Sequence, residues 1–237
     1  MLKVVEKNNL GVKCYEARNY QSAVNFFRNA LESITSPTAA ECETFTLALP
    51  HHNCLSGAVG SVVNPFIPIL KAQLLSEDGP MDAQTFHCFT QAMEVVSSPT
   101  AYSENPIANE MILSAMIIWN MAIVYHCTSR GSGNRLRRAY ALYLKSWNLM
   151  ESLVCHGSRG NHMIDFFTQA LLNNLGGCCQ ELGHNDDARF WSDQLIFYAQ
   201  SIGTSMSDEP SDVSALLQEQ TNHFVLNAIM RLQCRPS

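Results

Sequence analysis

The chain has 237 residues, of which 46% are hydrophobic and 15% are charged, and its net charge is −6. A chain of this length buries a substantial core, as one large domain or two small ones. The negative charge gives no bulk attraction to nucleic acid or to an acidic lipid surface, so we expect neither nucleic acid nor a membrane as a partner.

The sequence indicates a reduced intracellular compartment, the cytoplasm or the nucleus. Residues Met1–Leu10 contain two lysines and too short an apolar run for a secretory signal. The most apolar window, Met111–Tyr125, is interrupted by Asn120, and we expect it to be too short to span a bilayer. Nine cysteines without a paired spacing argue against a disulfide framework.

Residues 1–35 are predicted to form a hairpin of two helices, Lys3–Glu16 and Tyr20–Glu32. In the second helix Ala23, Phe27 and Ala30 follow one another at i, i+4 and i+7, which places them on one face. Small residues let two helix backbones approach closely, and the phenylalanine fills the space between them.

Residues 36–105 are predicted to form an irregular acidic insert, because frequent prolines and glycines exclude long helices. We expect one or two short strands within it, at Phe66–Leu75 and Phe86–Val96. The second segment also fits helical spacing, and we favour the extended conformation. The insert precedes a basic stretch, Arg130–Lys145, so the two either lie against each other or form separate solvated faces.

The rest of the chain is predicted to be helical again. Residues 106–202 form two further hairpins, and residues 208–233 form a C-terminal capping helix that Ser211 can begin. The expected helices of these two hairpins are Ile107–His126, Arg135–Cys155, Asn161–Leu182 and Asp186–Ser201. We expect the first hairpin to stack on Ile107–Cys155 across the insert, so that residues 1–237 form a single domain.

An internal repeat links the three hairpins. Asn9-Leu10-Gly11 recurs as Asn120-Met121-Ala122 and as Asn174-Leu175-Gly176, and each is followed by an alanine on the next helix, namely Ala23, Ala139 and Ala188. This pattern resembles the tetratricopeptide repeat, in which Leu-Gly-x-x-Tyr precedes Ala-x-x-x-Phe. Cys14 and Cys179 depart from it at the tyrosine position, and a generic helical bundle is the alternative. The resemblance implies an all-α fold, a short α-solenoid of helical hairpins interrupted by the insert.

The resemblance also implies a way of binding. Tetratricopeptide proteins bind an extended peptide along the face made by the first helix of each pair. The matching groove positions here are Asn9, Val12, Tyr15, Asn120, Ile123, His126, Asn174 and Gln180. No basic residue adjoins the three asparagines, which argues against a carboxylate clamp and favours a neutral or amphipathic peptide or helix. The alternative is that these asparagines hold helix ends or fill structural positions of the repeat consensus.

No catalytic residue, cofactor or metal is predicted. Histidines and cysteines occur as adjacent pairs, such as His87-Cys88 and His126-Cys127, and adjacent helical side chains diverge by about 100°. We therefore expect a non-catalytic scaffold that binds another protein or peptide. The alternatives are an enzyme with a cleft between insert and helices, or a structural subunit that assembles, as a homo-oligomer for example, through an exposed apolar face at Met111–Trp119. The residues that would ring such a cleft are His51, His52, Glu94 and Asp165.

Overall fold

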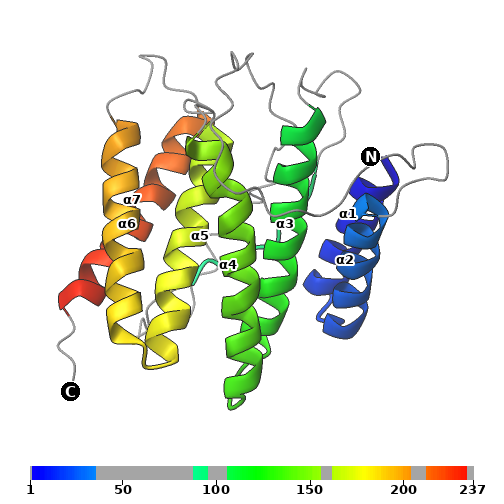
Figure 1. Cartoon of the computed structure of the whole chain (residues 1–237), viewed down its shortest axis with the longest axis horizontal. Helices are drawn as coiled ribbons and strands as arrows, with labels where there is room; N and C mark the ends of the chain where they lie inside the picture. The colour runs from blue at the N-terminus through cyan, green and yellow to red at the C-terminus, as the bar shows by residue number, and fades with distance from the viewer. Residues whose placement is uncertain (1, 36–87, 96–105, 156–161, 204–211, 234–237) are drawn as a thin grey trace.

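The computed structural model describes residues 2–35, 88–95, 106–155, 162–203 and 212–233, which comprise seven helices and one segment without regular structure, residues 88–95 (Figure 1). The helices are α1 (Leu2–Glu16), α2 (Tyr20–Thr35), α3 (Pro106–Cys127), α4 (Gly133–Cys155), α5 (His162–Glu181), α6 (Asn185–Gly203) and α7 (Asp212–Gln233). The predicted all-α class is confirmed, and the observed helices match the expected ones to within a few residues at their ends.

The helices stand side by side in a row, from α1 and α2 at one end to α6 and α7 at the other (Figure 1). Each helix packs on the next one in the chain, and in addition α1 touches α3 and α5 touches α7. The contact between α2 and α3 confirms that the first hairpin stacks on the hairpin that follows the insert. Buried residues from all seven helices and from segment 88–95 belong to one hydrophobic core.

The turns inside the first and third hairpins are built alike. Both end their first helix with a Schellman motif, in which one residue adopts the left-handed conformation and two N–H groups close the helix end. The left-handed residue is Arg18 (φ 58°) after α1 and Gly183 (φ 77°) after α5. The closing hydrogen bonds run from Arg18 to Tyr15, from Asn19 to Cys14, from Gly183 to Gln180 and from His184 to Cys179. The internal repeat is therefore also a repeat of backbone geometry.

The small residues of the repeat mark close helix contacts. A Cβ atom at Gly11 would lie 2.5 Å from Cε1 of Phe27, so α1 and α2 approach as closely as they do because residue 11 is glycine. Phe27 and its two flanking alanines on α2 are completely buried. The equivalent residues on α4, which are Ala139, Tyr143 and Ser146, are completely buried as well.

The expected strands of the insert are not found where the structure describes it. Phe66–Leu75 lies outside the described residues. Of Phe86–Val96, residues 88–95 are described, and they are neither helix nor strand. The prediction of a non-helical segment is right, but that of a strand is wrong there, because side chains rather than a second strand bind its main chain.

Helix α3 lies in the core. Residues 107–127 have a mean hydropathy of 1.6 and are long enough to cross a membrane by length and composition, contrary to the expectation from Met111–Tyr125. However, 67% of this apolar window is buried inside the protein. A mostly buried core helix of a globular protein can be as long and as apolar as a membrane-spanning helix. Ile112, Met116 and Trp119 are all buried, so Met111–Trp119 is not the exposed assembly face considered above.

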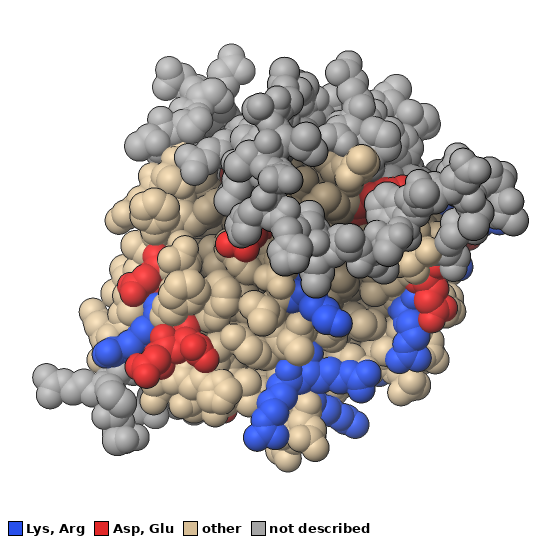
Figure 2. All heavy atoms as spheres, viewed as in Figure 1, with Lys and Arg blue, Asp and Glu red and all other residues tan. Residues whose placement is uncertain are grey.

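Basic side chains gather at the first turns of α4, in the lower centre of Figure 2. They are engaged locally, since Arg138 lies 4.7 Å from the ring centroid of Tyr125 and Arg135 Nη1 donates to the carbonyl of Thr128 (3.0 Å). Within the described ranges, no ion pair joins these arginines to an acidic residue of the insert.

Candidate functional site

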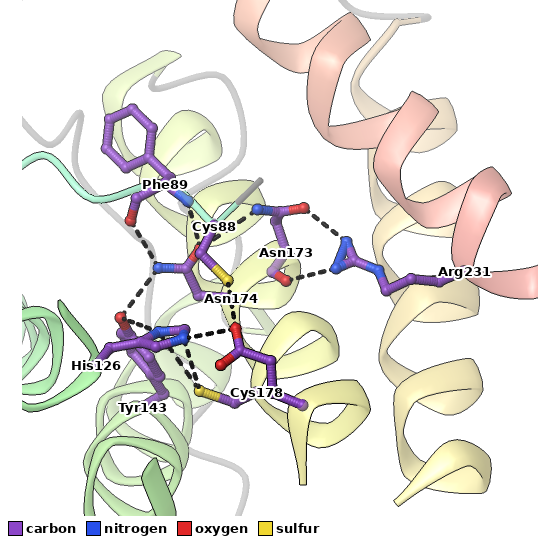
Figure 3. Close-up of polar contacts among 9 residues, drawn as sticks. Cys88, Phe89, His126, Tyr143, Asn173, Asn174, Cys178 and Arg231 are labelled. Atoms are coloured by element: carbon purple, nitrogen blue, oxygen red, sulfur yellow. Dashed lines mark hydrogen bonds and ion pairs between the residues drawn. The ribbon is translucent and has the colours of Figure 1, made fainter. Parts of the chain in front are cut away.

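The three asparagines of the repeat bind the main chain of segment 88–95. At Asn174 on α5, Oδ1 accepts the N–H of Phe89 (2.8 Å) and Nδ2 donates to the carbonyl of the same residue (2.8 Å). Figure 3 shows this pair, with the amide of Asn174 turned towards the backbone of Phe89. One side chain thus satisfies both main-chain polar groups of one residue.

The same arrangement recurs twice. Asn120 on α3 accepts the N–H of Met93 (2.7 Å) and donates to its carbonyl (2.9 Å). Asn9 on α1 accepts the N–H of Val95 (2.9 Å) and donates to its carbonyl (2.7 Å). Segment 88–95 therefore runs from α5 past α3 to α1, opposite to the order of these helices in the chain. We call Asn9, Asn120 and Asn174 the asparagine row.

The asparagine row lies within helices and not at their ends, so the alternative that these residues hold helix ends is wrong. Asparagine in a helix interior is less favourable than alanine by about 0.5–0.7 kcal/mol, because its amide competes with the backbone for hydrogen bonds. Asn120 and Asn174 are also completely buried, where an unpaired amide is costly. Three such residues on three helices share one role in the structure, which is to hold the main chain of segment 88–95.

At each end of the row, the asparagine that precedes the row residue in the sequence extends the hydrogen-bond network. These residues are Asn8 and Asn173. Asn8, completely buried, donates to the carbonyl of Met93 (3.1 Å) and accepts from Nδ2 of Asn120 (3.0 Å). At the other end, Arg231 of α7 donates to Oδ1 (2.6 Å) and to the carbonyl (2.9 Å) of Asn173, as Figure 3 shows. Burial lowers the pKa of Arg231 to about 10, so this guanidinium stays charged at neutral pH.

The apolar side chains of segment 88–95 enter the core. Phe89 makes edge-on contacts with Phe166 of α5 and Phe224 of α7, at centroid distances of 5.4 and 5.7 Å, and lies 6.3 Å from Trp119 of α3. Met93 is buried too, as is Val95. Full burial of a large apolar side chain stabilises by about 1.5–3 kcal/mol, so these three residues add the main apolar contribution to the binding of the segment.

Tyr15 and His126, also predicted to line the groove, both lie at the segment. The hydroxyl of Tyr15 donates to the carbonyl of Thr90 (2.7 Å). Burial raises the pKa of Tyr15, helped by the neighbouring Cys127 thiol, so the hydroxyl remains a donor across the physiological range.

His126 stands in a polar cluster at the Cys88 end of the segment. Its Nε2 lies 3.1 Å from Oε1 of Glu181, and its Nδ1 lies 3.3 Å from the hydroxyl of Tyr143 and 3.5 Å from Sγ of Cys178. Cys88 Sγ lies 4.0 Å from the same oxygen of Glu181. Cys88, His126 and Glu181 each offer one ligand atom, and these three atoms lie within 4.8 Å of one another.

Burial and contacts act in opposite directions on His126. Burial alone would lower its pKa, but contacts with Cys178, Cys88 and Glu181 outweigh burial and raise the pKa above its usual value. Burial raises the pKa of Cys178 to about 12, so this thiol is neutral at pH 7. Among the described residues, the carboxylate of Glu181 is the one paired with the imidazole, 3.1 Å from Nε2.

The remaining predicted groove residues lie elsewhere. Val12 and Ile123 are completely buried core residues, so they offer no surface to a partner. Gln180 is half-buried, and among the described residues no hydrogen bond joins it to segment 88–95. These positions were assigned by their place in the repeat, which does not distinguish the core side of a helix from the side that faces the segment.

Sequence reasoning missed the supporting residues Asn8 and Cys88 and the carboxylate of Glu181. One signal was available, because the first and third hairpins carry an asparagine doublet, Asn8-Asn9 and Asn173-Asn174. It also missed that the chain supplies the occupant of the row itself.

Comparison of the chain with models of known protein families, with curated proteins and with solved structures finds no significant match.

Proposed function

We propose that the protein is a non-catalytic scaffold that binds an extended peptide of a partner protein on the asparagine row. The observation that carries this proposal is the repeated pairing of one asparagine amide with the N–H and C=O of one residue of segment 88–95. These contacts hold a main chain whatever its side chains are, as in recognition by strand addition. Segment 88–95 is then the resident ligand, and a partner peptide takes its place.

The form of the ligand follows from the same contacts. A helical peptide has its N–H and C=O groups bound internally, so it offers no pair of main-chain groups to an asparagine. An extended peptide offers both. Of the two ligand forms expected from the sequence, peptide or helix, the asparagine row therefore favours the extended peptide.

Side chains would set the specificity. The resident segment buries Phe89, Met93 and Val95, and its one acidic residue, Glu94, is half-buried. A partner peptide would accordingly carry little net charge. It would carry large apolar residues at positions 1, 5 and 7, counted from the residue that takes the place of Phe89. This agrees with the neutral or amphipathic partner expected from the sequence.

We further propose that the helices form a short α-solenoid that resembles tetratricopeptide repeats. Its support is the common Schellman turn of the first and third hairpins, the buried small residues Ala23, Ala139 and Ala188, and the packing of each helix on its successor. In such a solenoid α1, α3 and α5 are the first helices of their pairs and line one face, and α7 caps the last pair.

The described cysteines are Cys14, Cys88, Cys127, Cys178 and Cys179, and all are free thiols. This supports placing the protein in a reducing compartment, the cytoplasm or the nucleus.

The two alternatives have less support. The structural-subunit alternative relied on an exposed face at Met111–Trp119, which is buried. Of the residues expected to ring an enzyme cleft, His51 and His52 lie outside the described residues. Asp165 is buried and accepts a hydrogen bond from the hydroxyl of Tyr198 (2.9 Å).

A labelled synthetic peptide of residues 86–98 tests the proposal by fluorescence anisotropy. The wild-type protein should bind it weakly, because its tethered segment competes at a high effective concentration. The double variant Phe89→Ala/Met93→Ala, which loosens the resident segment, should bind it at least about tenfold more tightly. Adding Asn174→Ala to this variant should remove binding, whereas adding Asn148→Ala, an exposed asparagine on α4, should not.

Circular dichroism and thermal melting confirm that each variant is folded. Hydrogen exchange of residues 88–95 reports whether the resident segment has left the row. If the segment leaves but the peptide does not bind, or if Asn174→Ala binds it equally well, the asparagine row is not a peptide site.

A further inference from the structure

Three side chains with metal-binding atoms converge where segment 88–95 passes between α3 and α5. Cys88 belongs to the segment, His126 to the last turn of α3 and Glu181 to the end of α5. The ligand atoms are a sulfur, an imidazole nitrogen and a carboxylate oxygen, all within 4.8 Å of one another. The adjacent pairs His87-Cys88 and His126-Cys127 each contribute one member, so the site joins residues from different pairs.

The distances suit a small tetrahedral ion. With metal–sulfur bonds of about 2.3 Å and metal–nitrogen or metal–oxygen bonds of about 2.0–2.2 Å, neighbouring ligand atoms are about 3.3–3.6 Å apart. His126 Nε2 and Glu181 Oε1 are 3.1 Å apart, and Cys88 Sγ is 4.0 Å from that oxygen. All three ligand atoms lie within 4.8 Å of one another, so the cysteine sulfur has to move towards the other two when an ion binds.

The surroundings fit a metal ligand set. The side chain of Glu181 is 47% exposed and that of His126 is 7% exposed, so an ion can enter from solvent beside the carboxylate and keep a water as its fourth ligand. The other ring nitrogen of His126 faces the hydroxyl of Tyr143, which in turn accepts from Nδ2 of Asn174 (3.1 Å). Such an outer hydrogen bond fixes the orientation of a ligating histidine (Figure 3).

The backbone of α5 leaves room for the thiol. A Cβ atom at Gly177 would stand 2.6 Å from Sγ of Cys88, so any side chain there would displace the sulfur. Gly177 therefore allows Cys88 to lie directly against α5, near both other ligands.

We propose that Cys88, His126 and Glu181 bind one divalent cation of the zinc class, and that this ion fastens segment 88–95 to α3 and α5. Binding releases the Cys88 thiol proton, and any proton on Nε2 of His126, to solvent. The thiolate and the carboxylate then balance the two positive charges of the ion. The same Asn174 amide contacts both Phe89 and Tyr143, so the ion site and the asparagine row share one hydrogen-bond network. This inference concerns the protein with its own segment in place and does not rest on the proposed function, because a peptide that replaced the segment would also remove Cys88 from the ion.

Cobalt provides the test, because Co²⁺ takes zinc sites and absorbs visible light. Titration of the reduced, tag-free, full-length protein with Co²⁺ should saturate at one equivalent. It should give the visible bands of a tetrahedral ion and a near-ultraviolet sulfur-to-cobalt band, and Zn²⁺ should displace both. Cys88→Ser should abolish the sulfur band, and Glu181→Gln should weaken binding by at least about tenfold. Cys14→Ser, a half-buried cysteine on α1, should leave the sulfur band in place.

Hydrogen exchange supplies a second readout, since Zn²⁺ should slow exchange of residues 88–95 in the wild-type protein and not in Cys88→Ser. Far-ultraviolet circular dichroism checks that the variants are folded. The proposal is overturned if no stoichiometric binding occurs, or if the sulfur band survives in folded Cys88→Ser, because another thiol would then hold the ion.

Discussion

Replacing Asn120 by alanine is the most direct perturbation of the asparagine row. Its completely buried amide makes three hydrogen bonds, to the N–H and the carbonyl of Met93 and to Oδ1 of Asn8. The carbonyl of Met93 keeps a second donor in Asn8, but the Met93 N–H and the Asn8 oxygen lose their partner. Asn120→Ala therefore removes three contacts and leaves two buried groups unsatisfied.

The magnitude follows from these contacts. Three hydrogen bonds at about 1 kcal/mol each give about 3 kcal/mol, and each unsatisfied buried group adds about 1–3 kcal/mol if nothing relaxes. The higher helix propensity of alanine offsets about 0.5 kcal/mol of this loss. If segment 88–95 leaves the helices, its unsatisfied polar groups bind water, which limits the total loss of stability. We therefore expect the free energy of unfolding to fall by about 2–4 kcal/mol.

Urea denaturation measures this fall, and hydrogen exchange localises it. The amide of Met93 should exchange about 30-fold to 1,000-fold faster in Asn120→Ala, which corresponds to about 2–4 kcal/mol at 1.36 kcal/mol per factor of ten. Asn148→Ala, on the exposed face of α4, is the matched control and should change the free energy of unfolding by less than about 0.5 kcal/mol. If Asn120→Ala behaves like this control and Met93 exchanges at the wild-type rate, Asn120 does not hold the segment.

Four further substitutions test the packing and the repeated turn. Arg18→Gly should raise the free energy of unfolding by about 0.5–1 kcal/mol, because Arg18 adopts the left-handed φ of 58°. Gly183→Ala should lower it by about 1 kcal/mol through the backbone alone, since φ there is 77° and an added Cβ meets nothing within 4 Å. Urea denaturation measures both changes, and equal and negligible changes would contradict the left-handed conformation. Gly11→Ala should lower the melting temperature through a loss of about 1–3 kcal/mol, because its Cβ would stand 2.5 Å from Phe27; an unchanged melting temperature would show that α1 and α2 are not so close. Phe89→Ala should either lower the free energy of unfolding by about 3–5 kcal/mol or release the segment, which hydrogen exchange of residues 88–95 detects; unchanged stability with unchanged protection would place Phe89 outside the core.

Local sequence signals located the helices. Apolar residues at helical spacing and the glycine or polar residues between them act over a few positions, so the boundaries of α1 through α7 follow closely from the chain itself. Helix α4 begins a little earlier than expected, at Gly133, because glycine and serine permit a first helical turn without requiring one.

The asparagine row was found from its sequence and its occupant was not. Three asparagines recurring before three small residues are visible in the sequence, and an amide in a helix interior is unfavourable unless it has a task. What they bind is decided over about 85 residues of separation, between Asn174 and Phe89 or between Asn9 and Val95. The asparagines contact main-chain groups that every residue carries. The side chains of segment 88–95 therefore give no sequence pattern from which these contacts could be predicted.

By itself, then, the sequence determined the all-α class, the three hairpins and the three asparagines, because each depends on residues close together in the chain. The tertiary structure alone decided that segment 88–95 lies on those asparagines, that Val12 and Ile123 turn into the core, and that Cys88, His126 and Glu181 meet. These arrangements depend on how whole helices pack and on which residue of segment 88–95 lies next to each of them. Such long-range positions are set by the packing of the complete core, for which no single stretch of sequence holds the information.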